Sequence, residues 1–291
     1  MMLQNYPLVR QGKVRDIYDA GEHLILVATD RLSAFDVILP TEIPGKGEIL
    51  TQLSILWFDL TRDLLPNHLV STDVSTLNLS TEEADWLRDR TMIVHKADRI
   101  DIECVVRGYL AGSGYKEYAQ SGTLAGESLP AGLQRADRLP SPAFTPAVKN
   151  DEGHDENISR QQLAEIVGPD LALQLEQKSL EIYQFASDLA AKAGIILADT
   201  KFEFGFINGQ LSLIDEVLTP DSSRYWEAAS VIPGEEPASF DKQIVRNWLE
   251  TLDWDKTAPG PQIPDEIVER TLLRYKEVYD RLSNVAKGTN A

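Results

Sequence analysis

Short runs of alternating apolar and polar residues dominate the first hundred positions, and they predict β-strands separated by turns. The expected strands cover residues 14–18, 23–28, 37–39, 92–95 and 102–107. One helix should interrupt them over residues 51–65, because apolar side chains recur there at helical spacing and Pro66 stops the pattern. Ser80 should start a second, short helix.

The pattern becomes mostly helical after about residue 110. Helices are expected over residues 112–120, 159–167, 169–193, 240–252 and 264–286. Residues 121–150 are rich in Gly, Pro, Ser and Ala, so they predict a long loop, and residues 195–217 predict a strand and hairpin. Together these elements indicate an α+β fold, with an antiparallel N-terminal lobe over residues 1–105 and a larger α+β lobe over residues 106–291.

Charged residues disturb the hairpin pattern of residues 195–217. Phe202, Phe204 and Phe206 alternate as a core strand would, and Asn208-Gly209 is a turn dipeptide, yet Lys201, Glu203 and Asp215 lie among them. A buried charge is costly unless it is paired, hydrogen-bonded or bound to a metal. A surface hairpin with salt bridges is the alternative, but the flanking phenylalanines argue against it.

Two hairpin registers are compatible with the sequence. A two-residue loop at Asn208-Gly209 would place Phe202 opposite Asp215, whereas a three-residue loop would pair Glu203 with Asp215 directly. Two adjacent carboxylates repel each other, but Mg²⁺, which prefers one or two carboxylates plus substrate phosphates, would stabilise them. Lys201 would share the face of Glu203 and could neutralise phosphate charge.

Basic and glycine-rich motifs elsewhere could bind anions. In RQGKVRD, Lys13 and Arg15 alternate on one strand face behind Gly12, an arrangement that suits a polyphosphate, although a solvated edge strand would look the same. In ECVVRGYLAGSG, Arg107 ends an apolar strand before a run of glycines that holds Ser113, which suits phosphate or carboxylate binding.

Two polar loops complete the candidate chemistry. Ser33 and Asp36 lie in ATDRLSAFD between apolar strands, where an ordinary turn is equally compatible. Lys149, His154 and Asp155 lie in a turn before a helix; the spacing matches no standard zinc pattern, so a structural or substrate contact is expected of His154.

Composition narrows the class of protein. The formal net charge of the 291-residue chain is −18, which argues against nucleic-acid or anionic-membrane partners. Cys104, the only cysteine, lies in an apolar run and is expected in the core. The sequence contains no P-loop, no G-x-G-x-x-G and no H-R-D motif, no signal peptide and no membrane-length apolar run, so a cytosolic protein is expected. A carboxylate pair with scattered cations is typical of ATP-dependent phosphoryl transfer.

Seven motifs, in one order along nearly the whole chain, resemble the SAICAR synthetase family of de novo purine biosynthesis. The motifs are GKVRDIYD, ATDRLSAFD, ECVVRGYLAGSGYKEY, FTPAVKNDEGHDENIS, LADTKFEFG, DEVLTPDSSRYW and SFDKQIVRNWL. The resemblance implies a two-lobed α+β fold, related to ATP-grasp and kinase-like architectures, with ATP between the lobes. It also implies a Mg²⁺-dependent ligase that joins L-aspartate to CAIR, 5-amino-1-(5-phospho-D-ribosyl)imidazole-4-carboxylate, with cleavage of ATP to ADP and phosphate through an acyl phosphate.

The resemblance also implies roles for individual residues. The ATP-binding set is Gly12, Lys13, Val14, Arg15, Val94, Lys96, Glu103 and Lys201, with residues 94–99 as a hinge beside adenine. Lys201, Glu203 and Asp215 form the expected catalytic set, and the latter two are the Mg²⁺ ligands. The expected substrate set is Ser33, Asp36, Arg107, Ser113, Lys149, His154, Asp155 and Arg224. A small-molecule kinase and a non-catalytic nucleotide-binding protein are the rival interpretations, and either a monomer or a homodimer is compatible with the sequence.

Overall fold

A five-stranded antiparallel sheet forms the N-terminal part of the computed structural model, which describes residues 1–149 and 156–289. Its strands, in spatial order, are β1 (Leu8–Gln11), β2 (Arg15–Ala20), β3 (His23–Ala28), β7 (Thr91–His95) and β6 (Leu69–Ser71). A small hairpin of β4 (Ser33–Ala34) and β5 (Val37–Ile38) follows β3.

A larger antiparallel sheet is built around β15 (Ile195–Ile207), the longest strand. Its other strands are β8 (Asp98–Arg99), β9 (Ile102–Tyr109), β12 (Arg138–Phe144), β13 (Ala147–Val148), β14 (Glu156–Asn157), β16 (Gln210–Ile214) and β17 (Ser223–Glu227). β9, β16, β17 and β8 all pair with β15, so this strand carries partners on both edges.

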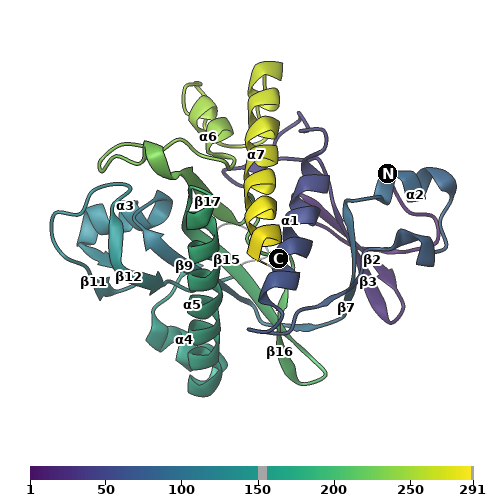
Figure 1. The fold of residues 1–291 in the computed structure, drawn as a ribbon, viewed down its shortest axis with the longest axis horizontal. Helices are drawn as coiled ribbons and strands as arrows, with labels where there is room; N and C mark the ends of the chain where they lie inside the picture. The colour runs from purple at the N-terminus through teal and green to yellow at the C-terminus, as the bar shows by residue number, and fades with distance from the viewer. Residues whose placement is uncertain (150–155, 290–291) are drawn as a thin grey trace.

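Three long helices connect the two sheets, as Figure 1 shows. α1 (Lys46–Thr61) packs against β3 and β7 of the smaller sheet, and α5 (Pro169–Lys192) packs against β9 and β15 of the larger sheet. α7 (Asp265–Thr289) lies against both helices and joins the two layers. The shorter elements are α2 (Thr81–Leu87), α3 (Gly112–Ser121), α4 (Arg160–Val167), α6 (Gln243–Leu249), the hairpin of β10 (Thr123–Leu124) and β11 (Glu127–Ser128), and 3₁₀ turns at Val74–Thr76 and Ala228–Ser230.

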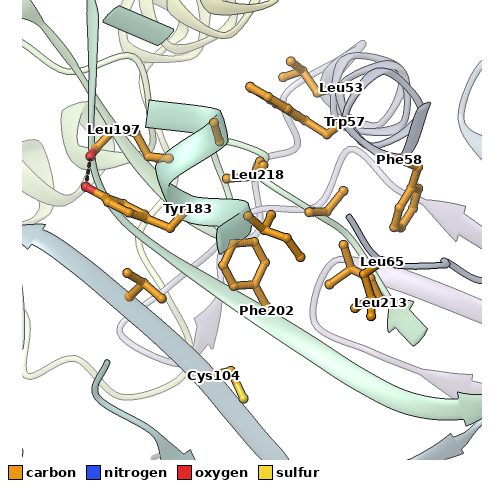
Figure 2. Close-up of a cluster of buried hydrophobic side chains, with 14 of the residues drawn as sticks. Leu53, Trp57, Phe58, Leu65, Cys104, Tyr183, Leu197, Phe202, Leu213 and Leu218 are labelled. Atoms are coloured by element: carbon orange, nitrogen blue, oxygen red, sulfur yellow. Dashed lines mark hydrogen bonds between the residues drawn. The ribbon is translucent and has the colours of Figure 1, made fainter. Parts of the chain in front are cut away.

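The main hydrophobic core lies where these helices meet β15 and β16 (Figure 2). Phe202 and Phe204 are fully buried beside Trp57 of α1 and Leu213 of β16. Cys104 is buried in the same cluster, and burial raises the pKa of its thiol, so the cysteine acts as an apolar core residue.

A β-bulge in β15 decides which of its residues face that core. Leu197 pairs with Tyr225 and Asp199 with Arg224 of β17, so Ala198 is an extra residue in the ladder. Before the bulge the odd-numbered Leu197 belongs to the core, and after it the even-numbered Phe202 does. The bulge therefore turns Asp199, and the alternate positions that follow it, toward the opposite face.

The expected α+β fold with an antiparallel N-terminal sheet is confirmed. Residues 121–150 were expected to form a loop, and this is wrong for the part that the structure describes, because β10 to β13 lie there and β12 and β13 pair with β9. α1 begins earlier than expected, at Lys46, and α6 is shorter than the helix expected over residues 240–252. The lobe boundary after residue 105 stays a prediction. Within the described chain, none of the helices has the length and apolar character needed to cross a bilayer.

Candidate active site

One large cleft, of about 1100 Å³, separates the two sheets. Apolar side chains from the smaller sheet and the segment after it form one wall, among them Val14, Leu24, Leu26, Val94 and Ala97. Charged residues from β9, β15 and the segment after β16 form the opposite wall. Val94, expected to contact adenine, lines the apolar wall, where a flat aromatic base would fit.

The glycine turn before β2 is held in a fixed shape. The amide of Gly12 donates to the carbonyl of Arg15 at 2.7 Å, and a Cβ at Gly12 would lie 3.0 Å from that oxygen. Arg31 braces the turn from behind, because its guanidinium donates to the carbonyls of Gly12 at 3.0 Å and Lys13 at 3.3 Å. Lys13 projects from the turn and forms an exposed ion pair with Asp36.

The hairpin between β15 and β16 has the two-residue turn, and Asp215 lies outside its ladder. Ile207 pairs with Gln210, and Glu203 pairs with Ile214, the last residue of β16. Asp215 then adopts a left-handed conformation with φ of 65°, which separates it from the regular pairing. Of the two registers compatible with the sequence, the structure has the two-residue loop, and Phe202 has no ladder partner at Asp215.

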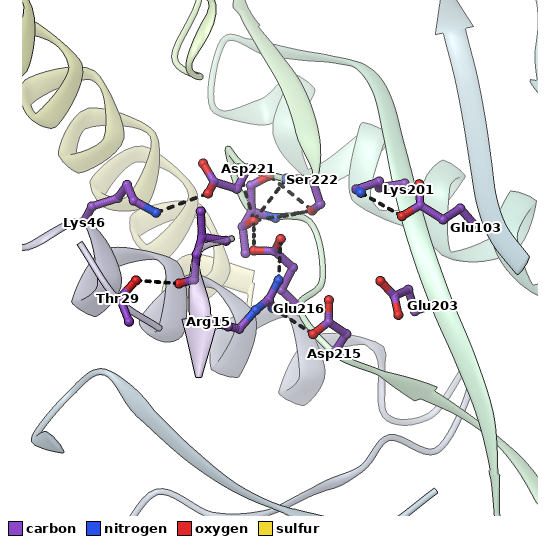
Figure 3. A network of polar contacts seen from close by, with 12 residues as sticks. Arg15, Thr29, Lys46, Glu103, Lys201, Glu203, Asp215, Glu216, Asp221 and Ser222 are labelled. Carbon is purple, nitrogen blue, oxygen red and sulfur yellow. Dashed lines mark hydrogen bonds and ion pairs between the residues drawn. The ribbon is translucent and has the colours of Figure 1, made fainter. Parts of the chain in front are cut away.

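Arg15 is the cation nearest to the carboxylates that follow β16, as Figure 3 shows. Its guanidinium lies 3.1 Å from Asp215 and 2.9 Å from Glu216. Burial alone would lower the pKa of Arg15, but these two carboxylates outweigh it and raise that pKa. Arg15 therefore fixes the position of Asp215 as well as contributing a positive charge to the cleft.

Lys201 and Glu203, two positions apart on β15, are each paired with a different neighbour. Lys201 lies 2.9 Å from Glu103 of β9, and Glu203 forms an ion pair with Lys149. Burial opposes the charged form of Lys201, but Glu103 outweighs it and raises the lysine pKa. Burial likewise opposes the charged form of Glu203, but Lys149 outweighs it and lowers the carboxyl pKa. Both side chains are thus held in their charged forms in the cleft.

Arg107 and Arg224 meet at a carboxylate that carried no role in the sequence-based prediction. Asp199 Oδ2 lies 2.9 Å from Arg107 Nη1 and 2.5 Å from Arg224 Nη1. Ser113 accepts a further hydrogen bond from Arg107 Nη2 at 3.2 Å. Three residues from distant parts of the sequence, Arg107, Ser113 and Arg224, are therefore brought together in the same part of the cleft.

The remaining expected residues are distributed less uniformly. Ser33 and Asp36 lie on the β4–β5 hairpin and line the cleft, and Asp36 has a left-handed φ of 63°. The Lys96 side chain instead pairs with Asp19 at 2.8 Å, away from the residues that line the cleft, so only its backbone could contribute there. His154 and Asp155 lie outside the residues that the structure describes.

Besides Asp199, four further cleft residues were missed at the sequence level. Lys242 directly before α6, Arg246 of α6 and Asp221 in the loop before β17 lie in motifs of the family resemblance, but none of them was expected to have a role. Asp221 is buried against Lys46 of α1 at 3.2 Å, and burial lowers the pKa of Lys242 to about 8. His68, also in the cleft, is buried, and burial lowers its pKa to about 4, so its imidazole is neutral. An isolated histidine in a β-prone segment gave no signal in the sequence.

The two carboxylates expected to bind Mg²⁺ fit one kind of site. In the described part of the chain, no cluster of three or more His, Cys, Asp or Glu side chains could hold a metal without help. Glu203 and Asp215 supply only two carboxylates, and Mg²⁺ commonly binds one or two carboxylates together with substrate phosphates. The donor set therefore suits Mg²⁺ that arrives with a nucleotide.

Comparisons with known proteins agree with this geometry. A family model described as SAICAR synthetase matches residues 8–261. The phosphoribosylaminoimidazole-succinocarboxamide synthases of Elusimicrobium minutum and Syntrophotalea carbinolica are 48% and 52% identical, and the matches cover 98% and 97% of this chain and 98% and 96% of theirs.

Solved structures give the same result. The SAICAR synthase of Saccharomyces cerevisiae complexed with SAICAR superposes with a TM-score of 0.90 at 43% identity, over 98% of this chain and 97% of the other. A Type-2 SAICAR synthetase in complex with ADP gives a TM-score of 0.69 at 28% identity, over 94% of this chain and 97% of that one. The chain belongs to the SAICAR synthetase family, and the ligase activity and the place in purine biosynthesis expected from its sequence are confirmed.

Proposed function

We propose that this chain joins L-aspartate to CAIR at the expense of Mg-ATP, with ATP between the apolar wall and the β15 wall of the cleft. The observation that carries the proposal is the common face of β15, where Asp199, Lys201 and Glu203 line the same cleft as Arg15 and Asp215. One wall is suited to an aromatic base and the other to phosphates and carboxylates.

In the first step, a carboxylate oxygen of CAIR attacks the γ-phosphorus of ATP, and ADP leaves. A free carboxylate is a poor acylating agent, because oxide would have to leave, whereas the acyl phosphate can release phosphate. Lys201 and Lys13 are placed to neutralise phosphate charge, and Arg15 adds a buried positive charge beside Asp215. Mg²⁺, when bound, neutralises charge on the phosphate oxygens, and Glu203 and Asp215 would hold it.

In the second step, the amine of L-aspartate attacks the acyl carbon, phosphate leaves, and the nitrogen loses a proton. The amine must be unprotonated to attack, so its binding pocket has to favour the neutral form. Arg107, Ser113 and Arg224 would hold the ribose phosphate of CAIR, which keeps the acyl carbon at a fixed position relative to the γ-phosphate. A cytoplasmic location remains a prediction of the sequence, and both a monomer and a homodimer remain compatible with it.

The decisive experiment measures ADP and the succinocarboxamide product with and without L-aspartate. A ligase should form both products in equal amounts, and formation of the succinocarboxamide should require all three substrates. A small-molecule kinase would release ADP equally well without L-aspartate and give no amide, and a nucleotide-binding protein without activity would release neither product. Either of those outcomes would overturn the proposal.

A matched variant tests the metal role of Asp215. Asp215→Asn should bind CAIR normally but lose nearly all turnover, because a neutral amide is a poor ligand for Mg²⁺. Asp188→Asn, an exposed position on α5, should keep full activity. Normal turnover in Asp215→Asn would remove this residue from the metal site.

A further inference from the structure

Arg107, Asp199 and Arg224 form one row across three strands. Asp199 on β15 is the direct cross-strand partner of Arg107 on β9 and also of Arg224 on β17. Directly opposite side chains in an antiparallel pair lie close enough to interact. The bulge at Ala198 places Asp199 on the cleft face, so the sheet itself positions one carboxylate between two guanidinium groups.

The two arginines differ in how many of their donors are already used. Arg107 is 5% exposed, and it donates from Nε to Thr145 Oγ1 at 3.1 Å, from Nη1 to Asp199, and from Nη2 to Ser113. The Arg224 side chain is 23% exposed, and it donates from Nη1 to Asp199. Arg107 therefore has more of its donors engaged, and Arg224 presents more of its N–H groups to the cleft.

Backbone contacts restrict Arg224 further. A Cβ on Gly112 would lie 2.2 Å from Arg224 Nη2, so the guanidinium rests directly against the glycine backbone. Gly112 has a φ of +52°, a backbone conformation that residues other than glycine rarely adopt. Asp199 raises the pKa of Arg224, so the arginine is firmly held in its charged form. Asp199 and Gly112 together leave this guanidinium little freedom to turn.

We propose that Asp199 is a positioning residue, which holds Arg107 and Arg224 as a preformed pair that recognises the phosphomonoester of the substrate. The inference rests on the proposed function, since CAIR brings a ribose phosphate into the cleft. Two adjacent guanidinium groups repel each other, and a single carboxylate between them offsets one of the two positive charges. The two guanidinium groups can then stay side by side before the substrate arrives, which reduces the cost of ordering them on binding.

The test compares CAIR with its riboside, which lacks the 5′-phosphate. For each variant, kcat/KM is measured with both substrates, and their ratio reports the preference for the phosphate. Asp199→Asn keeps the size and a hydrogen-bond acceptor but removes the charge, so this ratio should fall by about tenfold or more. The loss should appear mainly in the KM for CAIR, while the KM for ATP stays unchanged. Asp188→Asn serves as the control and should keep the wild-type ratio.

Other outcomes would overturn the proposal. A purely structural role for Asp199 would lower kcat/KM equally for both substrates, so the ratio would not change. A rise in the ratio would mean that Asp199 only weakens phosphate binding through its charge. If Asp199→Asn does not fold, Thr145→Val, which frees Arg107 Nε, should lower the same ratio, and an unchanged ratio would again contradict the proposal. If the wild-type chain makes no succinocarboxamide at all, the proposed function fails, whereas a normal wild type with an unaffected Asp199→Asn ratio refutes only the positioning role.

Discussion

Replacing Arg15 by glutamine tests whether the buried carboxylates of Asp215 and Glu216 depend on a fixed cation for their stability. Arg15 lies 3.1 Å from Asp215 and 2.9 Å from Glu216, and the three side chains are 14%, 24% and 10% exposed. At an effective dielectric constant of about 20, each contact is worth roughly 5 kcal/mol before desolvation is subtracted. Breaking a buried pair by removing one partner typically costs about 3–5 kcal/mol, which is a large part of the stability of a folded domain.

The assay is urea unfolding followed by tryptophan fluorescence, first with ADP in EDTA and then with ADP in MgCl₂, at matched ionic strength. Arg15→Gln should lower the free energy of unfolding by about 3–5 kcal/mol in EDTA. A bound cation would replace the missing charge, so Mg²⁺ should restore more stability to this variant than to the wild type. Arg62→Gln is the matched control, because the Arg62–Asp59 pair is exposed at the C-terminal end of α1 and its loss should cost less than about 1 kcal/mol.

Two results would refute this reasoning. If Arg15→Gln is no less stable than Arg62→Gln, the carboxylates of Asp215 and Glu216 do not depend on a fixed cation. If Mg²⁺ stabilises wild type and Arg15→Gln by the same amount, the metal does not bind next to these carboxylates.

Three further predictions follow from contacts elsewhere in the molecule. Lys13→Ala should raise the KM for ATP about tenfold or more in initial-rate assays, because one charge-assisted contact to the phosphates is lost. Lys96→Ala is the control and should leave that KM unchanged, because the Lys96 side chain points away from the cleft. His68 has a pKa of about 4 in the fold against 6.5 when unfolded, so its stabilising contribution is present above pH 6.5 and is lost as the pH falls toward 4. His68→Gln should remove about 3 kcal/mol of the pH dependence of the unfolding free energy in urea titrations. An unchanged pH dependence in this variant would contradict the prediction. Phe202→Ala should cost about 3–5 kcal/mol in the same unfolding assay and Phe202→Leu less, and equal losses would place the ring outside the core.

Much of the fold could be predicted from periodicity and capping. Ser80 and Ser159 both begin helices with a capping box, as their sequence context indicates. The loop predicted over residues 121–150 failed because β12 has little alternation of its own, and its strand conformation depends on pairing with β9. Pairing between segments distant in sequence is a tertiary effect that local composition does not record.

Residues of the candidate site could be predicted where charged side chains interrupt a recognisable sequence pattern. Lys201 and Glu203 stood out because charges interrupt a row of phenylalanines. Asp199 was visible as a charge, but its role depends on a bulge and on two partners that are 92 and 25 residues away. His68 could not have been found, because its significance comes only from burial beside Asp215.

The bulged strand β15 has a consequence for how this enzyme can change over evolutionary time. One face of it carries the cleft residues and the other carries Phe202 and Phe204, so inserting or deleting a single residue between Asp199 and Glu203 would exchange the two faces. Folding and catalysis would then fail together, so lineages should lose this activity by point substitution or by loss of the whole gene product, and not through gradual drift in strand length. The hairpin tip at Asn208-Gly209 belongs neither to the core nor to the cleft, so it is a suitable place to insert a tag or reporter into an active enzyme.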